Sequence, residues 1–62
     1  MDGANLNGVT YLGRREGTTY LFKDVSNAII ELDEESLYGR SILKVGGIFN
    51  IRKMRANCYL IN

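Results

Sequence analysis

Residues 37–51 read Leu-Tyr-Gly-Arg-Ser-Ile-Leu-Lys-Val-Gly-Gly-Ile-Phe-Asn-Ile, and two apolar runs within this stretch meet at a pair of glycines. The runs are residues 41–45 and 48–51, and Gly46 and Gly47 join them. A tight turn between antiparallel strands needs positive φ angles, which glycine adopts without steric cost. The stretch therefore predicts a β-hairpin with its turn at the two glycines.

Other strand candidates lie on both sides of this hairpin, because β-branched and aromatic residues recur in short runs between glycines and polar residues. Residues 9–12 and 18–23 are expected to form a hairpin around a polar turn at 13–17. The run at 48–54 alternates apolar and polar residues, residues 55–57 interrupt it, and residues 58–61 form a last short strand. We expect residues 1–8 to be a flexible N-terminal arm and residues 9–62 to be a single small β domain.

The segment at residues 25–36 fits two structures. As a helix capped by Asp24, it would place Val25, Ala28, Ile29 and Leu32 on one face. As a strand, it would alternate its apolar residues between two faces. Three acids at positions 33–35 would oppose the negative end of the helix dipole, and adjacent β-branched residues favour a strand. We expect a strand, with a short helix as the alternative.

These elements predict a mainly β fold, namely a small antiparallel barrel or sandwich of five to six short strands, of SH3-like or OB-like size. At 62 residues the chain buries only about 60% of the surface of its unfolded form, so its stability is marginal without further support. Cys58 is the only cysteine and histidine is absent, so neither an internal disulfide nor a usual zinc site can form. Self-association remains, and we expect a homodimer.

The composition is that of a globular protein, with 45% hydrophobic and 24% charged residues. No apolar run approaches the roughly 18 residues of a membrane span, and the first residues lack the basic and apolar regions of a signal peptide. We therefore expect a cytoplasmic protein without membrane contact. Without histidine, the usual nucleophile–base pairs are missing, so we expect no enzymatic activity, no cofactor and no metal site.

The net charge is only +1, but the charges are segregated along the chain. Residues 24–36 carry five acids and no base, and residues 37–62 carry five bases and no acid. Such blocks either form two surfaces of opposite charge or pair with each other. The first hypothesis is a protein-binding or regulatory module that self-associates. Its candidate partner-binding residues are Glu31, Asp33, Glu34 and Glu35, with Arg14 and Arg15 as a second patch at a hairpin tip.

The alternative is a nucleic-acid-binding small β-barrel, because such proteins combine a basic groove with aromatic side chains that stack on bases. Its contacts would come from Arg14, Arg15, Arg52, Lys53 and Arg55, with Tyr38 or Tyr59 stacking. This hypothesis requires the basic residues to share one face. The small size and the absence of catalytic residues would also suit a phage or mobile-element type of protein that acts on a host factor, an interpretation that rests on no motif.

Overall fold

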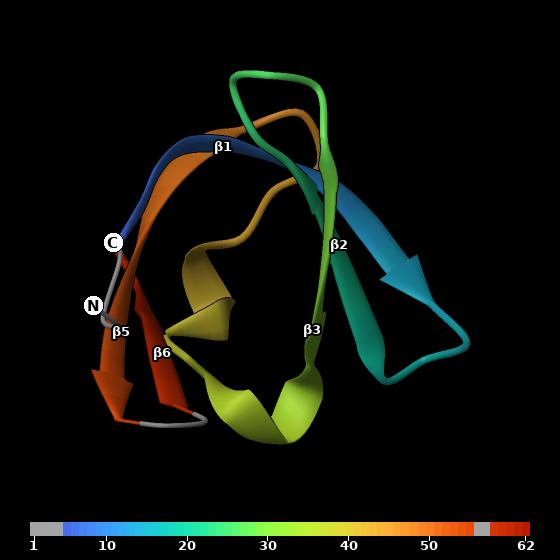
Figure 1. Cartoon of the computed structure of the whole chain (residues 1–62). Helices are drawn as coiled ribbons and strands as arrows, with labels where there is room; N and C mark the ends of the chain where they lie inside the picture. Colours follow the sequence, from blue (N-terminus) through green and yellow to red (C-terminus); the bar gives the residue numbers. More distant parts are fainter. Residues whose placement is uncertain (1–4, 56–57) are drawn as a thin grey trace.

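A computed structural model describes residues 5–55 and 58–62, which form a single sheet of six strands (Figure 1). The strand order is β3-β2-β1-β5-β6-β4, and every pairing is antiparallel except β4 with β6. The strands are β1 (Leu6–Arg15), β2 (Thr19–Lys23), β3 (Ile29–Asp33), β4 (Leu37–Tyr38), β5 (Ile48–Arg55) and β6 (Cys58–Ile61). Two 3-10 helices, η1 (Glu34–Ser36) and η2 (Arg40–Ile42), flank β4.

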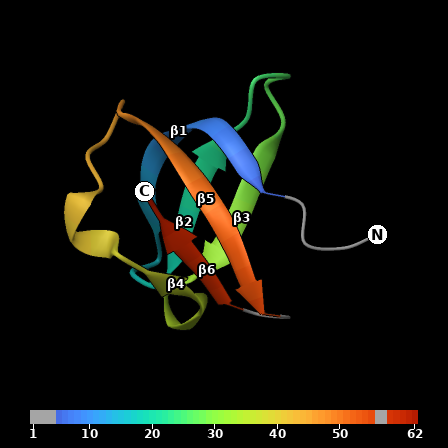
Figure 2. The same cartoon turned by 90° about the vertical axis from the view of Figure 1, so that its left-hand side faces the viewer.

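The predicted mainly β class is confirmed, but the predicted barrel or sandwich is wrong, because the structure is one open sheet. The sheet is strongly curved (Figure 1). β1 arches between a side formed by β5 and β6 and a side formed by β2 and β3. Figure 2 shows η2 and the chain that follows it lying beside the sheet rather than within it.

The curvature begins in β1, the longest strand, which pairs with β2 on one side and β5 on the other. Its register with β5 shifts between Leu6 and Val9, and its register with β2 shifts between Tyr11 and Gly13. Gly8 and Gly13, at these two irregularities, have φ angles of +70° and +119°. A bulge bends the strand that carries it and increases its twist, so the two glycines allow one strand to follow a curved path.

The strand prediction for residues 9–12 was too short at both ends. Leu6–Gly8, which we expected to belong to a flexible arm, form the first part of β1, and residues 1–4 lie outside the described residues. The hairpin of β1 and β2 is confirmed. Its turn lies at residues 16–18 rather than 13–17, and Glu16 and Gly17 there have positive φ, as tight hairpin turns require.

The strand prediction near residue 30 is confirmed for Ile29–Asp33, and the helix alternative for residues 25–36 is wrong apart from the single turn η1. Asp24 determines this local structure. Its Oδ1 accepts hydrogen bonds from the backbone N–H and the hydroxyl of Ser26, both at 2.8 Å, and from the N–H of Ala28 at 3.0 Å. With Asn27 at a φ of +71°, these bonds close a three-residue hairpin loop instead of starting a helix.

The hairpin predicted around Gly46 and Gly47 is wrong, although both glycines do lie in a turn. Residues 41–45 form no strand, and β5 pairs with β1 and β6 instead. The Gly47 N–H donates to the carbonyl of Lys44 at 2.8 Å, and Gly46 has a φ of +89°, which is the pattern of a type II turn. The backbone of both glycines then bonds to Tyr11, with the Tyr11 N–H donating to Gly47 and the Gly46 N–H donating to Tyr11.

The core lies on the concave side of the sheet and receives buried side chains from every strand except β3. The rings of Tyr11 and Tyr20 stack at 5.9 Å between centroids, and Phe22 lies 5.3 Å from Tyr11. The remaining buried members are Val9, Leu37, Ile51 and Ile61. Within the described residues, no helix is long and apolar enough to cross a membrane.

Alanine and asparagine should rank in opposite order at the two glycines of the turn, when the variants are compared by their loss of stability. Gly46 has open space around its α-carbon but a left-handed φ, so Gly46→Ala should cost about 1–2 kcal/mol and Gly46→Asn less, since asparagine tolerates this conformation. A Cβ at Gly47 would lie 2.9 Å from the Phe49 ring and 3.0 Å from the Lys44 carbonyl oxygen, so Gly47→Ala should cost about 1–3 kcal/mol and the larger asparagine more.

Urea unfolding of the four variants measures these costs. The same ranking of alanine and asparagine at both positions would contradict the assignment of the turn.

Candidate functional site

β3 is an open edge of the sheet, because within the described residues it pairs only with β2. The Asp24 N–H donates to the carbonyl of Ala28, and the Glu34 N–H donates to the carbonyl of Thr18. In an antiparallel pair, only every second residue of a strand bonds to the neighbouring strand. Since Ala28 and Glu34 both do so, the even-numbered residues of β3 between them bond to β2 as well. The backbone N–H and C=O groups of Ile29, Glu31 and Asp33 therefore point away from the sheet.

The side chains of these same three residues lie on the convex face of the sheet, opposite the core. Glu31 pairs across the sheet with Leu21, and Asp33 with Thr19, whereas Ile30 and Leu32 pack against the core. Glu31 accepts a hydrogen bond from Arg15 at 2.8 Å, and both side chains are about half exposed. Ile29 is 56% exposed. The edge thus presents one apolar and two acidic side chains beside free backbone groups.

An open hollow of about 320 Å³ lies at the end of β3, where the chain enters η1. It is lined by Thr18, Asp33, Glu34 and Glu35. Here η1 connects β3 directly to β4, the strand at the opposite edge of the sheet. The predicted acidic patch is therefore divided between the outer face of β3 and this turn.

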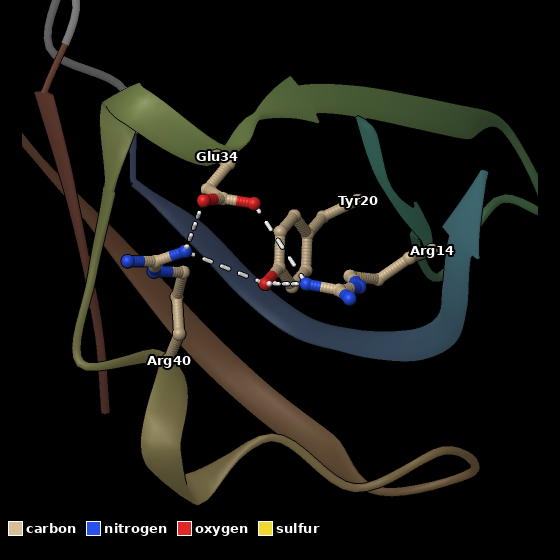
Figure 3. A network of polar contacts seen from close by, with 4 residues as sticks. All are labelled: Arg14, Tyr20, Glu34 and Arg40. Carbon is tan, nitrogen blue, oxygen red and sulfur yellow. Dashed lines mark hydrogen bonds and ion pairs between the residues drawn. The ribbon is translucent and has the colours of Figure 1, made fainter. Parts of the chain in front are cut away.

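Glu34 belongs to a second arrangement, a polar cluster of Arg14, Tyr20, Glu34 and Arg40 (Figure 3). The hydroxyl oxygen of Tyr20 accepts hydrogen bonds from Nη1 of Arg14 at 3.1 Å and from Nη1 of Arg40 at 3.5 Å. The guanidinium carbons lie 5.5 Å and 6.0 Å from the centre of the Tyr20 ring. The Glu34 carboxylate lies 3.7 Å from Arg14 and 3.3 Å from Arg40.

The hydrogen bonds of the cluster change the pKa values of Tyr20 and of the two arginines. The Arg14 hydrogen bond lowers the pKa of Tyr20 despite the burial of that side chain, because a cationic donor stabilises the phenolate, and Arg40 adds to this effect. The bond to Tyr20 in turn raises the pKa of both guanidinium groups. Tyr11 shows the opposite behaviour, since burial raises the pKa of its hydroxyl.

Arg14 and Arg15 do not form the single patch that we predicted. The bulge near Gly13 sets Arg14 opposite Tyr20, on the concave face, and sets Arg15 opposite Thr19, on the convex face. Arg14 thus joins the polar cluster, whereas Arg15 bonds to Glu31. The side chains of consecutive residues in a strand point to opposite faces of the sheet, so two arginines that are neighbours in the sequence lie on different faces.

The other predicted basic residues are divided in the same way. Lys53 pairs with Tyr59, which packs against the core, so both lie on the concave face. Arg52, Leu60 and Tyr38 form a row across the convex face of β5, β6 and β4, and Arg55 follows beside Cys58. Arg15 lies at the opposite end of β1 from the residues that pair near Arg52. The five basic residues therefore do not share one face.

Sequence reasoning missed Arg40 and Tyr20 as site residues. Arg40 lies just before the predicted strand at residues 41–45, and Tyr20 lies in the predicted strand at residues 18–23, and neither was a candidate site residue. The one available signal was the spacing of Tyr20 and Phe22 in β2, which places two aromatic rings on one face. The approach of Arg40 to Tyr20 depends on how η2 follows β4, which no local pattern predicts.

Among residues 5–55 and 58–62, no three acidic or thiol side chains come together in a way that could hold a metal ion. Comparison with known protein families, curated proteins and solved structures finds no match for this chain. We therefore infer the function from the geometry of β3 and of the polar cluster.

Titration of the tyrosines tests the cluster. Tyr20 should ionise at lower pH than Tyr11, and Arg14→Gln should raise the pKa of Tyr20 more than Arg40→Gln, because the Arg14 bond is the shorter one. NMR detection of the Cζ carbons follows each ring separately. Equal responses to the two substitutions would contradict this geometry.

The shift also predicts a dependence of stability on pH. Because the pKa of Tyr20 in the folded state lies below its ordinary value of 10.0, the stabilisation from its ionisation is fully present above pH 10.0 and is lost as pH falls through the folded-state pKa. Tyr20→Phe should lack this part of the pH profile in urea unfolding.

Proposed function

We propose that this chain is a small, non-enzymatic protein-binding module that takes an extended segment of a partner protein along the open edge of β3. The observation that carries the proposal is the row of outward-pointing backbone groups at Ile29, Glu31 and Asp33. A strand added at such an edge gains main-chain hydrogen bonds, while alternate side chains select its sequence.

β3 suits this role better than the other edge of the sheet. It has five residues, whereas β4 has two and pairs in parallel with β6. Soluble proteins usually protect an exposed edge with proline, lysine or a bulge. β3 contains neither residue, and its register with β2 is continuous. The edge is therefore geometrically open to a strand.

The acidic side chains on this edge favour a basic partner segment. Glu31, Asp33 and Glu35 lie along β3 and the hollow at its end. A second copy of the chain fits poorly here, because two β3 strands paired antiparallel about Glu31 would set the two Glu31 carboxylates opposite each other, and like charges in that position are destabilising. The homodimer expected from chain length would need another surface, and it remains a prediction.

The cytoplasmic location and the action on a host factor likewise remain proposals. The alternative function, nucleic-acid binding, has one supporting feature, the convex row of Arg52, Leu60 and the exposed Tyr38. That row is short, and neither Arg14 nor Lys53 lies on its face. We therefore favour protein binding.

A proline on the edge tests the proposal. Glu31→Pro removes an N–H that points away from β2, so it should leave the sheet folded but weaken binding of an extended lysine–valine model peptide by about tenfold or more. Glu31→Gln is the control, because it removes the same charge and keeps the N–H. Binding is measured by fluorescence anisotropy, and circular dichroism checks the fold.

Amide hydrogen exchange supplies a second readout that needs no variant. Peptide binding should protect the amides of Ile29, Glu31 and Asp33 and leave Ile30 and Leu32, which already bond to β2, unchanged. Unchanged exchange at the three outward amides, or equal affinity for the proline and glutamine variants, would refute edge binding.

Charge selectivity needs a separate experiment. The double variant Asp33→Asn and Glu35→Gln removes both charges. It should weaken binding of the basic peptide about 2- to 30-fold, since each exposed ion pair contributes about 0.2–1 kcal/mol. A control with Ser41→Lys and Asn62→Lys changes the net charge equally at exposed positions away from β3. Equal losses in both variants would show that only net charge matters.

A further inference from the structure

The ion pairs of the polar cluster are longer than another ion pair in the same molecule. Arg15 and Glu31 meet at 2.8 Å, the distance of a well-formed charge-assisted hydrogen bond. Glu34 lies 3.7 Å from Arg14 and 3.3 Å from Arg40, so it satisfies neither guanidinium group closely. One carboxylate also faces two cations, which leaves one positive charge in excess.

The two guanidinium groups are nevertheless held in place. They come from distant parts of the chain, β1 and η2, and both reach the hydroxyl oxygen of the buried Tyr20. Both also lie within 6.0 Å of the centre of its ring. Each makes its contacts to described residues through Nη1, and the two side chains are 50% and 40% exposed, so further donors of each fork are open to solvent.

We propose that Arg14, Tyr20 and Arg40 form a binding site for a phosphate group carrying two negative charges, and that Glu34 occupies this site when the ligand is absent. A phosphate dianion matches the charge of two guanidinium groups and offers several oxygens to their planar forks. The Tyr20 hydroxyl accepts from both arginines and still has its own proton to donate. Figure 3 shows the Tyr20 hydroxyl between the two arginines, with the Glu34 carboxylate beside them.

Glu34 is able to leave this position. It lies on η1, a single 3-10 turn whose N-cap residue, Asp33, makes no capping hydrogen bond with its side chain, and the Glu34 side chain is 38% exposed. Its two contacts are those of exposed ion pairs, which contribute little stability. Glu34 therefore acts as an internal competitor of weak affinity. The residues that would hold the phosphate lie on β1, β2 and η2 and not on β3, and the two sites meet only at Glu34, which also lines the hollow at the end of β3.

A titration with inorganic phosphate tests the proposal, with sodium chloride at matched ionic strength as the reference. NMR signals of Arg14, Arg40 and Tyr20 should move in a saturable way with phosphate and not with chloride. Arg40→Gln should weaken phosphate binding by about tenfold or more, because one charge-assisted contact is lost. Glu34→Gln should strengthen it about two- to fivefold, because the competitor is removed.

The sign of the Glu34 effect separates a ligand site from a purely structural cluster. If Glu34 only stabilised the fold, Glu34→Gln would leave phosphate binding unchanged or weaker, and that result would overturn the proposal, as would an equal response to chloride. Glu31→Gln is the matched control, since it removes the carboxylate of the tight ion pair on the opposite face, and it should not change phosphate affinity.

The last ligand to titrate is a short single-stranded oligonucleotide, because each of its phosphodiesters carries one negative charge instead of two. If the oligonucleotide moves the Arg14 and Arg40 signals more strongly than phosphate does, the cluster is a contact for a nucleic-acid backbone and the dianion proposal fails. Glu31→Pro should leave phosphate binding intact. If this variant loses peptide binding and keeps phosphate binding, the two sites are separate, and either proposal can hold without the other.

Discussion

The bend of β1 is the constraint on which the rest of the structure depends. Its two irregularities, at Gly8 and Gly13, use backbone conformations that other residues adopt at a cost. Because β1 bends, β2 and β5 curve toward each other around a common core instead of extending a flat sheet (Figure 1). The curvature also brings the strands at the two edges, β3 and β4, close enough for the three residues of η1 to connect them.

Tyr20 links this core to the polar cluster. Its ring stacks on Tyr11 inside the core, while its hydroxyl group receives the two arginines at the rim. Burial of one aromatic side chain stabilises the folded state by about 1.5–3 kcal/mol, whereas an exposed ion pair contributes about 0–1 kcal/mol. The core therefore positions the arginines, and the ion pairs with Glu34 are not needed to hold the fold. This division leaves the cluster able to exchange its carboxylate for a ligand.

In the proposed function, charge determines which chain the open edge of β3 accepts. Free backbone groups alone would pair with any extended chain, including another copy of this one. In the binding mode that we propose, Glu31 and Asp33 disfavour a second copy of β3 and favour a basic segment. In this small protein the acids thus take the place of the prolines and lysines that protect edges elsewhere.

The sequence by itself determined most of the strands. Runs of β-branched and aromatic residues located β2 and β6, and an alternating pattern located β5. The acids that follow Leu32 indicated correctly that Ile29–Asp33 is a strand and not part of an α-helix. The error at residues 41–45 has a physical cause. Ile42 and Val45 are 50% and 67% exposed, so of the apolar residues in this run only Leu43 packs against the core. The double glycine indicated a turn, but whether that turn joins two strands depends on the distant backbone of Tyr11.

Only the tertiary structure decided which charged side chains meet. Arg14 and Arg15 are neighbours in the sequence and lie on opposite faces because β-strand side chains alternate. Arg40 reaches Tyr20 because Gly39, with a φ of +81°, turns the chain after β4 where a Cβ would lie 3.0 Å from the Ile61 carbonyl oxygen. Local residue preferences determine where strands and turns form. The long-range pairing of β1 and the curvature of the sheet determine the composition of the site, and no window of sequence contains that information.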